Sequence, residues 1–106
     1  MATETEQQVE KASATKHAPR HNLILLDDDD HSYEYVIEML RSIFGYGEQQ
    51  SFKLALEVDS AGRAVIFTGH LEVVELKQDQ VHSFGADWRI PKCKGAMSTV
   101  IETVSG

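Results

Sequence analysis

The chain has 106 residues, enough for one small domain with a hydrophobic core but not for two. Its formal net charge of −7 disfavours nucleic acid and anionic membranes as partners, because both carry negative charge. No apolar run reaches transmembrane length and none resembles a signal peptide, so we expect a cytoplasmic protein. The single cysteine, Cys93, excludes an internal disulfide, and no His or Asn pattern near it indicates a catalytic nucleophile.

The first 21 residues differ in composition from the rest of the chain. After the initiator Met1 their only large apolar residue is Val9, which is too little to form a packed core. We therefore predict a disordered N-terminal extension over residues 1–21. Its three acidic and three basic residues cancel, so the net charge of −7 belongs to residues 22–106, the predicted folded domain.

Hydrophobic periodicity and glycine positions predict six elements in the folded part. They are a strand over 22–27, helices over 32–44 and 48–58, a strand over 63–68, a helix over 71–84 with Leu71 facing inward, and a strand over 97–102. Ser32 is predicted to cap the first helix, and Trp88 to pin the loop over 86–96. The β-α-α-β-α-β order favours a single α+β domain, in which three helices pack on a three-stranded sheet.

Four consecutive aspartates, Asp27 to Asp30, lie between the first strand and the first helix. Crowding carboxylates there is unfavourable, which indicates a cationic ligand such as a divalent metal, an ammonium group or a basic protein surface. A solvated loop that only caps the helix remains the alternative. If the second helix packs alongside the first, Ala55, Val58 and Asp59 approach this loop. The result would be an apolar hollow with carboxylates at its rim, which suits an amine with an apolar side chain.

Three sequence blocks carry a family resemblance at constant spacing: LLDDDDHSYEYVIEML (25–40), LALEVDSAGRA (54–64) and LEVVELK (71–77). Over residues 22–102 the chain resembles the ClpS adaptors, which deliver proteins bearing N-terminal degrons to a Clp-type AAA+ protease. The resemblance implies an adaptor without enzymatic activity or a cofactor. It implies that the free N-terminal residue of a substrate is bound, with its bulky hydrophobic side chain in a preformed pocket.

The resemblance also implies roles for individual residues. Contacts to the substrate amine are expected from Asp27, Asp28, Asp29 and Asp59. The hydrophobic pocket is expected to be lined by His31, Tyr33, Val36, Ala55, Val58 and Met97. Contacts to the N-terminal domain of the Clp unfoldase are expected from Glu72 and Lys77.

Four of these positions depart from the family pattern. Asp27 replaces an Asn and Asp59 a His, so acceptors are kept and negative charge is added. Tyr33 and Ala55 each replace a Met, so one pocket wall becomes bulkier and the opposite wall smaller. We expect aromatic or leucine-like first residues to bind, in a reshaped pocket that admits β-branched residues or loses leucine.

Two other functions remain open from the sequence. A metal site would use the four aspartates with His31, with or without Asp59, to hold Mg²⁺, Mn²⁺ or Zn²⁺. Alternatively, the chain is a module that docks on the unfoldase through Glu72 and Lys77 but has lost or altered degron recognition.

Overall fold

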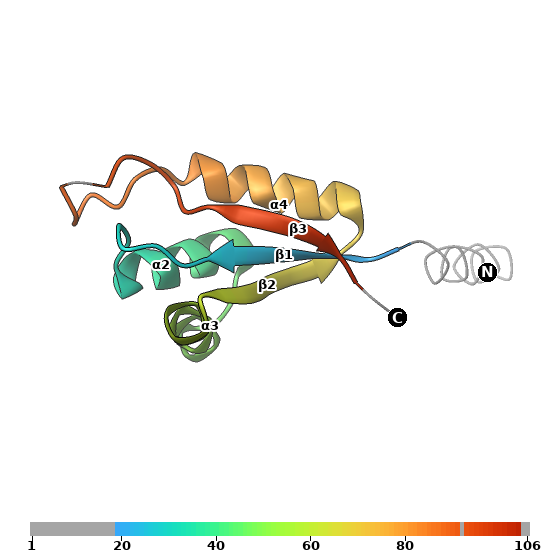
Figure 1. Ribbon diagram of the computed structural model, residues 1–106, viewed down its shortest axis with the longest axis horizontal. Helices are drawn as coiled ribbons and strands as arrows, with labels where there is room; N and C mark the ends of the chain where they lie inside the picture. Colours follow the sequence, from blue (N-terminus) through green and yellow to red (C-terminus); the bar gives the residue numbers. More distant parts are fainter. Residues whose placement is uncertain (1–18, 92, 105–106) are drawn as a thin grey trace, which may run out of the picture.

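Three strands and three helices make up the computed structural model, which describes residues 19–91 and 93–104 (Figure 1). In chain order they are β1 (His21–Leu26), α2 (Tyr33–Phe44), α3 (Glu48–Ala61), β2 (Arg63–Gly69), α4 (Leu71–Ser83) and β3 (Thr99–Thr103). The predicted element order and the α+β class are confirmed. The sheet begins one residue earlier than predicted, and the Arg20 carbonyl accepts a hydrogen bond from the Val104 amide (2.8 Å). Residues 1–18 of the predicted extension lie outside the described residues.

The central strand β1 is buried on both of its faces. The sheet has the antiparallel order β2-β1-β3. Leu23 and Leu25 join the core cluster, while Ile24, only 1% exposed, points to the opposite face. On that face the Arg63 guanidinium of β2 lies 2.9 Å from the Glu102 carboxylate of β3. The ion pair therefore spans β1 and helps to cover Ile24.

Helix α2 lies behind β1 and is flanked by α3 and α4 (Figure 1). The predicted cap is confirmed, because the Ser32 hydroxyl accepts a hydrogen bond from the Tyr35 amide (3.1 Å). The helix ends at Gly45, whose φ of 71° is a left-handed conformation that glycine adopts without steric penalty. The buried side chains of α2 are Tyr35, Val36, Met39 and Leu40.

Helix α3 is longer than predicted. It continues past Val58 to Ala61, because Gly62 is the first residue that leaves the helical conformation (φ 83°). The Gly62 amide still donates a hydrogen bond to the Val58 carbonyl (2.9 Å). As a result Asp59 lies in the last turn of α3, and the chain passes directly from Gly62 into β2 at Arg63.

Helix α4 packs on the core through Val74 and Val81, which are fully buried. The prediction that Leu71 faces inward is wrong, since this residue is 41% exposed. Leu71 is the first residue of α4, and helical periodicity shows which side faces the core but not how far the core extends along the axis. In the part of the chain that the structure describes, no helix has the length and apolar character needed to cross a membrane.

Asp87 fastens the loop over residues 84–98, here called the C-terminal loop, to the start of α2. Its buried carboxylate accepts hydrogen bonds from the Ser32 amide and hydroxyl, both at 2.7 Å, and from the Arg89 amide (3.1 Å) and guanidinium (3.2 Å). The prediction that Trp88 pins this loop is wrong, because Trp88 is 81% exposed. A carboxylate accepts several hydrogen bonds at once, whereas an indole has only one N–H donor, and this difference favours Asp87 as the anchor.

These contacts make the fold sensitive to acid. Burial raises the pKa of the Asp87 carboxyl, but the hydrogen bonds from Ser32 and Arg89 lower it more, to about 2. Because the pKa is lower in the folded state, the ionised carboxylate stabilises the fold at pH values above 3.8, the pKa in the unfolded chain. This stabilisation is lost as the pH falls towards 2.

We expect Asp87→Asn to lower the free energy of unfolding by about 2 kcal/mol at pH 7. The difference from the native chain should shrink between pH 4 and pH 2, where the native carboxylate becomes protonated. Urea denaturation followed by circular dichroism measures both effects. The exposed neighbour provides the control, since Trp88→Ala should change stability by less than about 0.5 kcal/mol. Equal stability of Asp87→Asn and the native chain at pH 7 would contradict the anchoring role.

Candidate functional site

The acidic run Asp27 to Asp30 begins where β1 leaves the sheet, and its main chain is held on both sides. The Leu26 amide donates a hydrogen bond to the Ser98 carbonyl (3.0 Å), and the Asp27 amide donates one to the Gly62 carbonyl (3.0 Å). Because Gly62 ends α3, the second bond brings Asp27 to the end of the helix that carries Asp59. The first and third aspartates of the run are exposed, and the second and fourth are half-buried.

The second aspartate, Asp28, is tied to His31. Its Oδ1 accepts a hydrogen bond from the Asp30 amide (2.9 Å) and lies 2.7 Å from His31 Nδ1. The His31 side chain is only 4% exposed, and its Nε2 lies 2.7 Å from the Gly95 carbonyl oxygen. His31 therefore joins the acidic run to the C-terminal loop. Its predicted place in the pocket wall stays a prediction.

A further neighbour of His31, Cys93, was not expected from the sequence. Cys93 Sγ lies 3.3 Å from His31 Nε2 and 3.3 Å from the Gly95 carbonyl oxygen, and it accepts a hydrogen bond from the Asp87 amide (3.1 Å). The cysteine and the histidine are 62 positions apart. Their contact depends on how the C-terminal loop folds back over the start of α2, for which no local sequence pattern exists.

Tyr33 and Asp59 link the first turn of α2 to the last turn of α3. The Tyr33 hydroxyl donates a hydrogen bond to Asp59 Oδ2 at 2.6 Å, and the Tyr33 ring meets the Phe52 ring edge-on with 6.2 Å between centroids. This hydrogen bond raises the pKa of Tyr33, and partial burial and the negative charges of Asp59 and Asp27 raise it further. Asp27 and Asp59 therefore lie near the same hydroxyl group.

Four of the predicted pocket residues belong to the buried core cluster and are here called the apolar patch: Val36, Ala55, Val58 and Met97. They come from α2, α3 and the segment before β3, and each is at most 5% exposed. Tyr33 lies one turn before Val36, and Asp59 directly follows Val58. Two members of the patch, Val36 and Val58, therefore lie close along the chain to the Tyr33–Asp59 contact.

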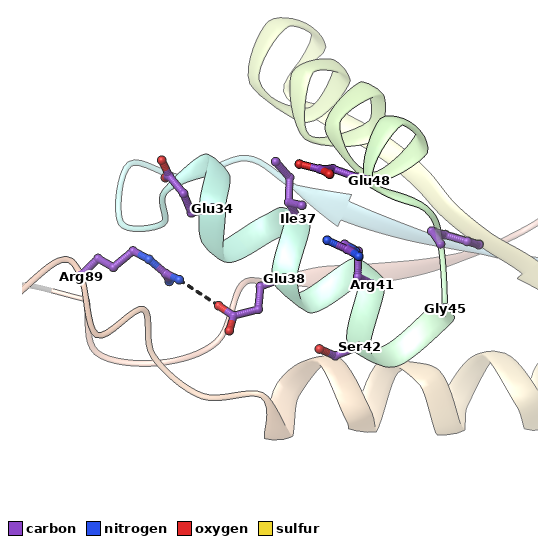
Figure 2. Close-up of a pocket in the computed structure, with 9 residues that line it drawn as sticks. Glu34, Ile37, Glu38, Arg41, Ser42, Gly45, Glu48 and Arg89 are labelled. Atoms are coloured by element: carbon purple, nitrogen blue, oxygen red, sulfur yellow. Dashed lines mark hydrogen bonds and ion pairs between the residues drawn. The ribbon is translucent and has the colours of Figure 1, made fainter.

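Two hollows lie on a different side of α2. The larger, about 640 Å³, is lined by Glu34, Ile37, Glu38, Arg41, Ser42, Gly45, Tyr46, Glu48 and Arg89. In Figure 2 Arg89 reaches from the C-terminal loop towards Glu38, at 3.0 Å between Nη2 and Oε2. The smaller, about 430 Å³, is lined by Ile37, Glu48, Gln49, Phe52 and Lys53. Neither hollow was predicted, and neither includes a residue of the apolar patch.

The aspartates do not converge as metal ligands. Within residues 19–91 and 93–104, no three His, Cys, Asp or Glu side chains are arranged so that they could hold a metal ion. Asp28 instead bonds to His31, and Asp59 bonds to Tyr33. The geometry of these side chains gives no support to the metal-binding alternative.

The two residues expected to contact the unfoldase lie on α4, but in different settings. Glu72 is exposed in the first turn. Lys77 is half-buried, with its Nζ donating a hydrogen bond to the Ile43 carbonyl (2.9 Å) and lying 5.5 Å from the centre of the Phe44 ring. Lys77 therefore also fastens α4 to the end of α2. Exposed apolar side chains accompany Glu72 on α4, at Leu71, Val73 and Leu76.

Comparison with known proteins bears on what this arrangement is for. The sequence model of the ATP-dependent Clp protease adaptor protein ClpS matches residues 16–89. The ClpS adapter protein of Mycobacterium marinum (strain ATCC BAA-535 / M) is 35% identical over 78 residues, which are 74% of this chain and 77% of that protein. The ClpS adapter protein of Ruegeria sp. (strain TM1040) is 36% identical over 70 residues, which are 66% of this chain and 62% of that protein.

A solved structure shows the same fold. ClpS2 of Agrobacterium tumefaciens, bound to L-phenylalaninamide, is similar with a TM-score of 0.71 and 19% sequence identity, over 83% of this chain and 100% of that chain. The match to the family's sequence model covers more than half of this chain. The chain belongs to the ClpS family of ATP-dependent Clp protease adaptors.

Proposed function

We propose that this adaptor binds the free N-terminal residue of substrate proteins, when that residue has a bulky hydrophobic side chain, and delivers them to a Clp-type AAA+ unfoldase in the cytoplasm. One observation supports the proposal: Asp27 and Asp59 both lie near the Tyr33 hydroxyl, and Val36 and Val58 of the apolar patch are one turn and one residue away from this contact. An ammonium group needs hydrogen-bond acceptors of negative charge, and the side chain beside it needs an apolar surface. Both are available at this end of the α2–α3 pair.

The acidic run offers free acceptor positions for the ammonium. Both contacts described for the Asp28 carboxylate end on Oδ1, which leaves Oδ2 to accept a hydrogen bond from a ligand. Asp27 and Asp29 are exposed. The relative from Agrobacterium tumefaciens is bound to L-phenylalaninamide, a molecule with a free amine next to an aromatic side chain. This ligand supports the same chemical class of ligand here.

The hydrogen bond between Tyr33 and Asp59 is the main departure of this site from the family pattern. Asp59 already accepts a hydrogen bond from Tyr33, and the residues of the apolar patch are at most 5% exposed. An incoming apolar side chain therefore reaches the patch only if the side chains that cover it move. We propose that the ligand ammonium replaces the Tyr33 hydroxyl at Asp59, and that the tyrosine ring then moves aside to become a wall of the pocket.

The first test is fluorescence anisotropy with short labelled peptides that begin with Phe, Tyr, Trp, Leu, Ile or Met. We expect binding of the aromatic or leucine-like first residues, and loss of binding when the same peptides are N-acetylated, because acetylation removes the ammonium charge. The double variant Asp28→Ala with Asp59→Ala should weaken binding by at least about tenfold, and EDTA should have no effect.

Other outcomes of this test lead to other functions. Loss of peptide binding with EDTA would support the metal site. Absence of binding to any free N-terminus, together with intact binding to the unfoldase, would support the docking module that has lost degron recognition.

Tyr33→Phe tests whether the tyrosine hydroxyl competes with the ligand. Removing the hydroxyl leaves Asp59 without its internal donor, so we expect peptides with a free N-terminus to bind about two- to tenfold more tightly. The same measurement on Tyr33→Phe with Asp59→Ala should show no gain. A weaker affinity of Tyr33→Phe alone would mean that the hydroxyl contacts the ligand directly.

Glu72→Lys tests docking on the unfoldase. We expect weaker association with the N-terminal domain of the unfoldase, measured by calorimetry, and unchanged peptide affinity, because Glu72 is exposed on α4 and lies away from the acidic run. Glu57→Lys makes the same change of charge at an exposed position on α3 and serves as the control. Equal loss of both activities in Glu72→Lys would indicate misfolding and contradict a docking role.

A further inference from the structure

Asp28, His31 and Cys93 form a row of carboxylate, imidazole and thiol. Asp28 Oδ1 lies 2.7 Å from His31 Nδ1, and His31 Nε2 lies 3.3 Å from Cys93 Sγ. A nucleophile next to an imidazole that a carboxylate orients is the arrangement that activates thiols and hydroxyls in enzymes. Asp28 and His31 lie within the residues that match the family's sequence model, and Cys93 lies beyond them.

The two ring nitrogens of His31 both face hydrogen-bond acceptors. Nδ1 faces the Asp28 carboxylate, and Nε2 faces the Gly95 carbonyl oxygen at 2.7 Å. Nε2 also lies 3.3 Å from Cys93 Sγ, whose thiol donates to the same Gly95 carbonyl oxygen at 3.3 Å. His31 is thus within reach of the thiol proton when Cys93 reacts, and Asp28 orients the imidazole ring for that role.

The Cys93 sulfur atom has two further contacts besides His31. Its thiol donates to the Gly95 carbonyl oxygen (3.3 Å), and the Asp87 amide donates a hydrogen bond to Sγ (3.1 Å), which stabilises negative charge on the sulfur atom as the thiol proton leaves. The Asp87 carboxylate is also close by, but Ser32 and Arg89 donate four hydrogen bonds to it and offset its charge. Cys93 is only partly buried, which allows a small reagent to reach it.

We propose that Cys93 is a reactive thiol that hydroperoxides oxidise, and that its reactivity is coupled to ligand binding at Asp28. The thiolate attacks one peroxide oxygen, so that an S–O bond forms as the O–O bond breaks. The sulfur atom loses two electrons and becomes a sulfenic acid, while the peroxide is reduced. His31 takes the thiol proton and passes it to the departing oxygen, which leaves as water from hydrogen peroxide or as an alcohol from an organic hydroperoxide.

The coupling rests on the proposed function, because it requires an ammonium at Asp28. A bound ammonium adds positive charge beside His31 and competes with the imidazole for the Asp28 carboxylate. Ligand binding therefore makes His31 a weaker acceptor for the thiol proton and should slow oxidation of Cys93. Since the coupling is a linkage between two equilibria, proton transfer from Cys93 to His31 must also weaken ligand binding.

The test follows reaction of the full chain with hydrogen peroxide at pH 7, with dimedone trapping of sulfenic acid and mass spectrometry. Cys93 is the only cysteine, so every dimedone adduct reports on it. A free thiol is only a few per cent ionised at pH 7, so we expect the folded chain to react about tenfold faster than the chain unfolded in urea. His31→Asn and Asp28→Asn should each remove most of this difference.

Two control variants test whether the faster oxidation of Cys93 depends on His31 and Asp28 themselves or only on the charge of the protein. His70→Asn changes an exposed histidine, and Asp79→Asn removes an exposed carboxylate on α4 that belongs to no proposed site. Both should react like the native chain. If either test variant fails to fold by circular dichroism, the other decides the result. Native reaction rates in folded His31→Asn or Asp28→Asn would overturn the activation of Cys93.

The coupling is tested by repeating the reaction with saturating L-phenylalaninamide, with binding measured separately by calorimetry. We expect oxidation to slow by about threefold or more. Binding of the ligand with no change in rate would overturn the coupling alone. Absence of binding would overturn the proposed function and the coupling together, while the His31 and Asp28 variants would still decide whether the thiol is activated.

Discussion

Two main-chain hydrogen bonds fix the place where the chain leaves the central strand, and the candidate site depends on them. They join Leu26 to Ser98 and Asp27 to Gly62. The first bond holds the acidic run against the segment that precedes β3, and the second holds it against the end of α3. A site built from three distant parts of the chain therefore has one rigid reference point, set by the backbone.

The distribution of charge shows how the fold tolerates so many carboxylates. Asp28 is compensated by His31, Asp59 by the Tyr33 hydroxyl, and Asp87 by Ser32 and Arg89. A carboxylate that accepts hydrogen bonds from the protein itself can be buried or half-buried without a bound cation. Asp27 and Asp29 are exposed, so solvent screens them until a cationic ligand arrives. The site is thus partly neutralised from within, and a ligand competes with these internal donors.

Much of the fold was accessible from the sequence because its signals are local. The spacing of apolar residues, the Ser32 cap and the glycines at helix ends predicted the order of the elements and most of their boundaries. Two predictions about burial were wrong, because they depend on how far the core extends. Leu71 has the right spacing for burial yet is exposed, and Trp88 is apolar yet does not anchor its loop. Sequence patterns describe one element at a time, whereas burial is decided by the elements that meet it.

The candidate site, too, could be predicted from the sequence only in part. The acidic run and the family resemblance predicted a site made from residues 27–36 and 55–59, and in the structure Tyr33 of the first stretch bonds to Asp59 of the second. Neither that hydrogen bond nor the contact between His31 and Cys93 could be foreseen. They join positions 26 and 62 residues apart, and they depend on side-chain directions that no pattern encodes.

A single residue, Gly62, connects α3 to β2, and this limits how the length of the chain can change during evolution. An inserted residue there would turn α3 by roughly 100° about its axis or shift β2 along β1, and either change would carry Asp59 away from Asp27. The C-terminal loop is different, because its anchors are few and the segments between them are not paired in the sheet. Insertions and deletions among relatives should therefore accumulate in that loop, while the connection at Gly62 keeps its length.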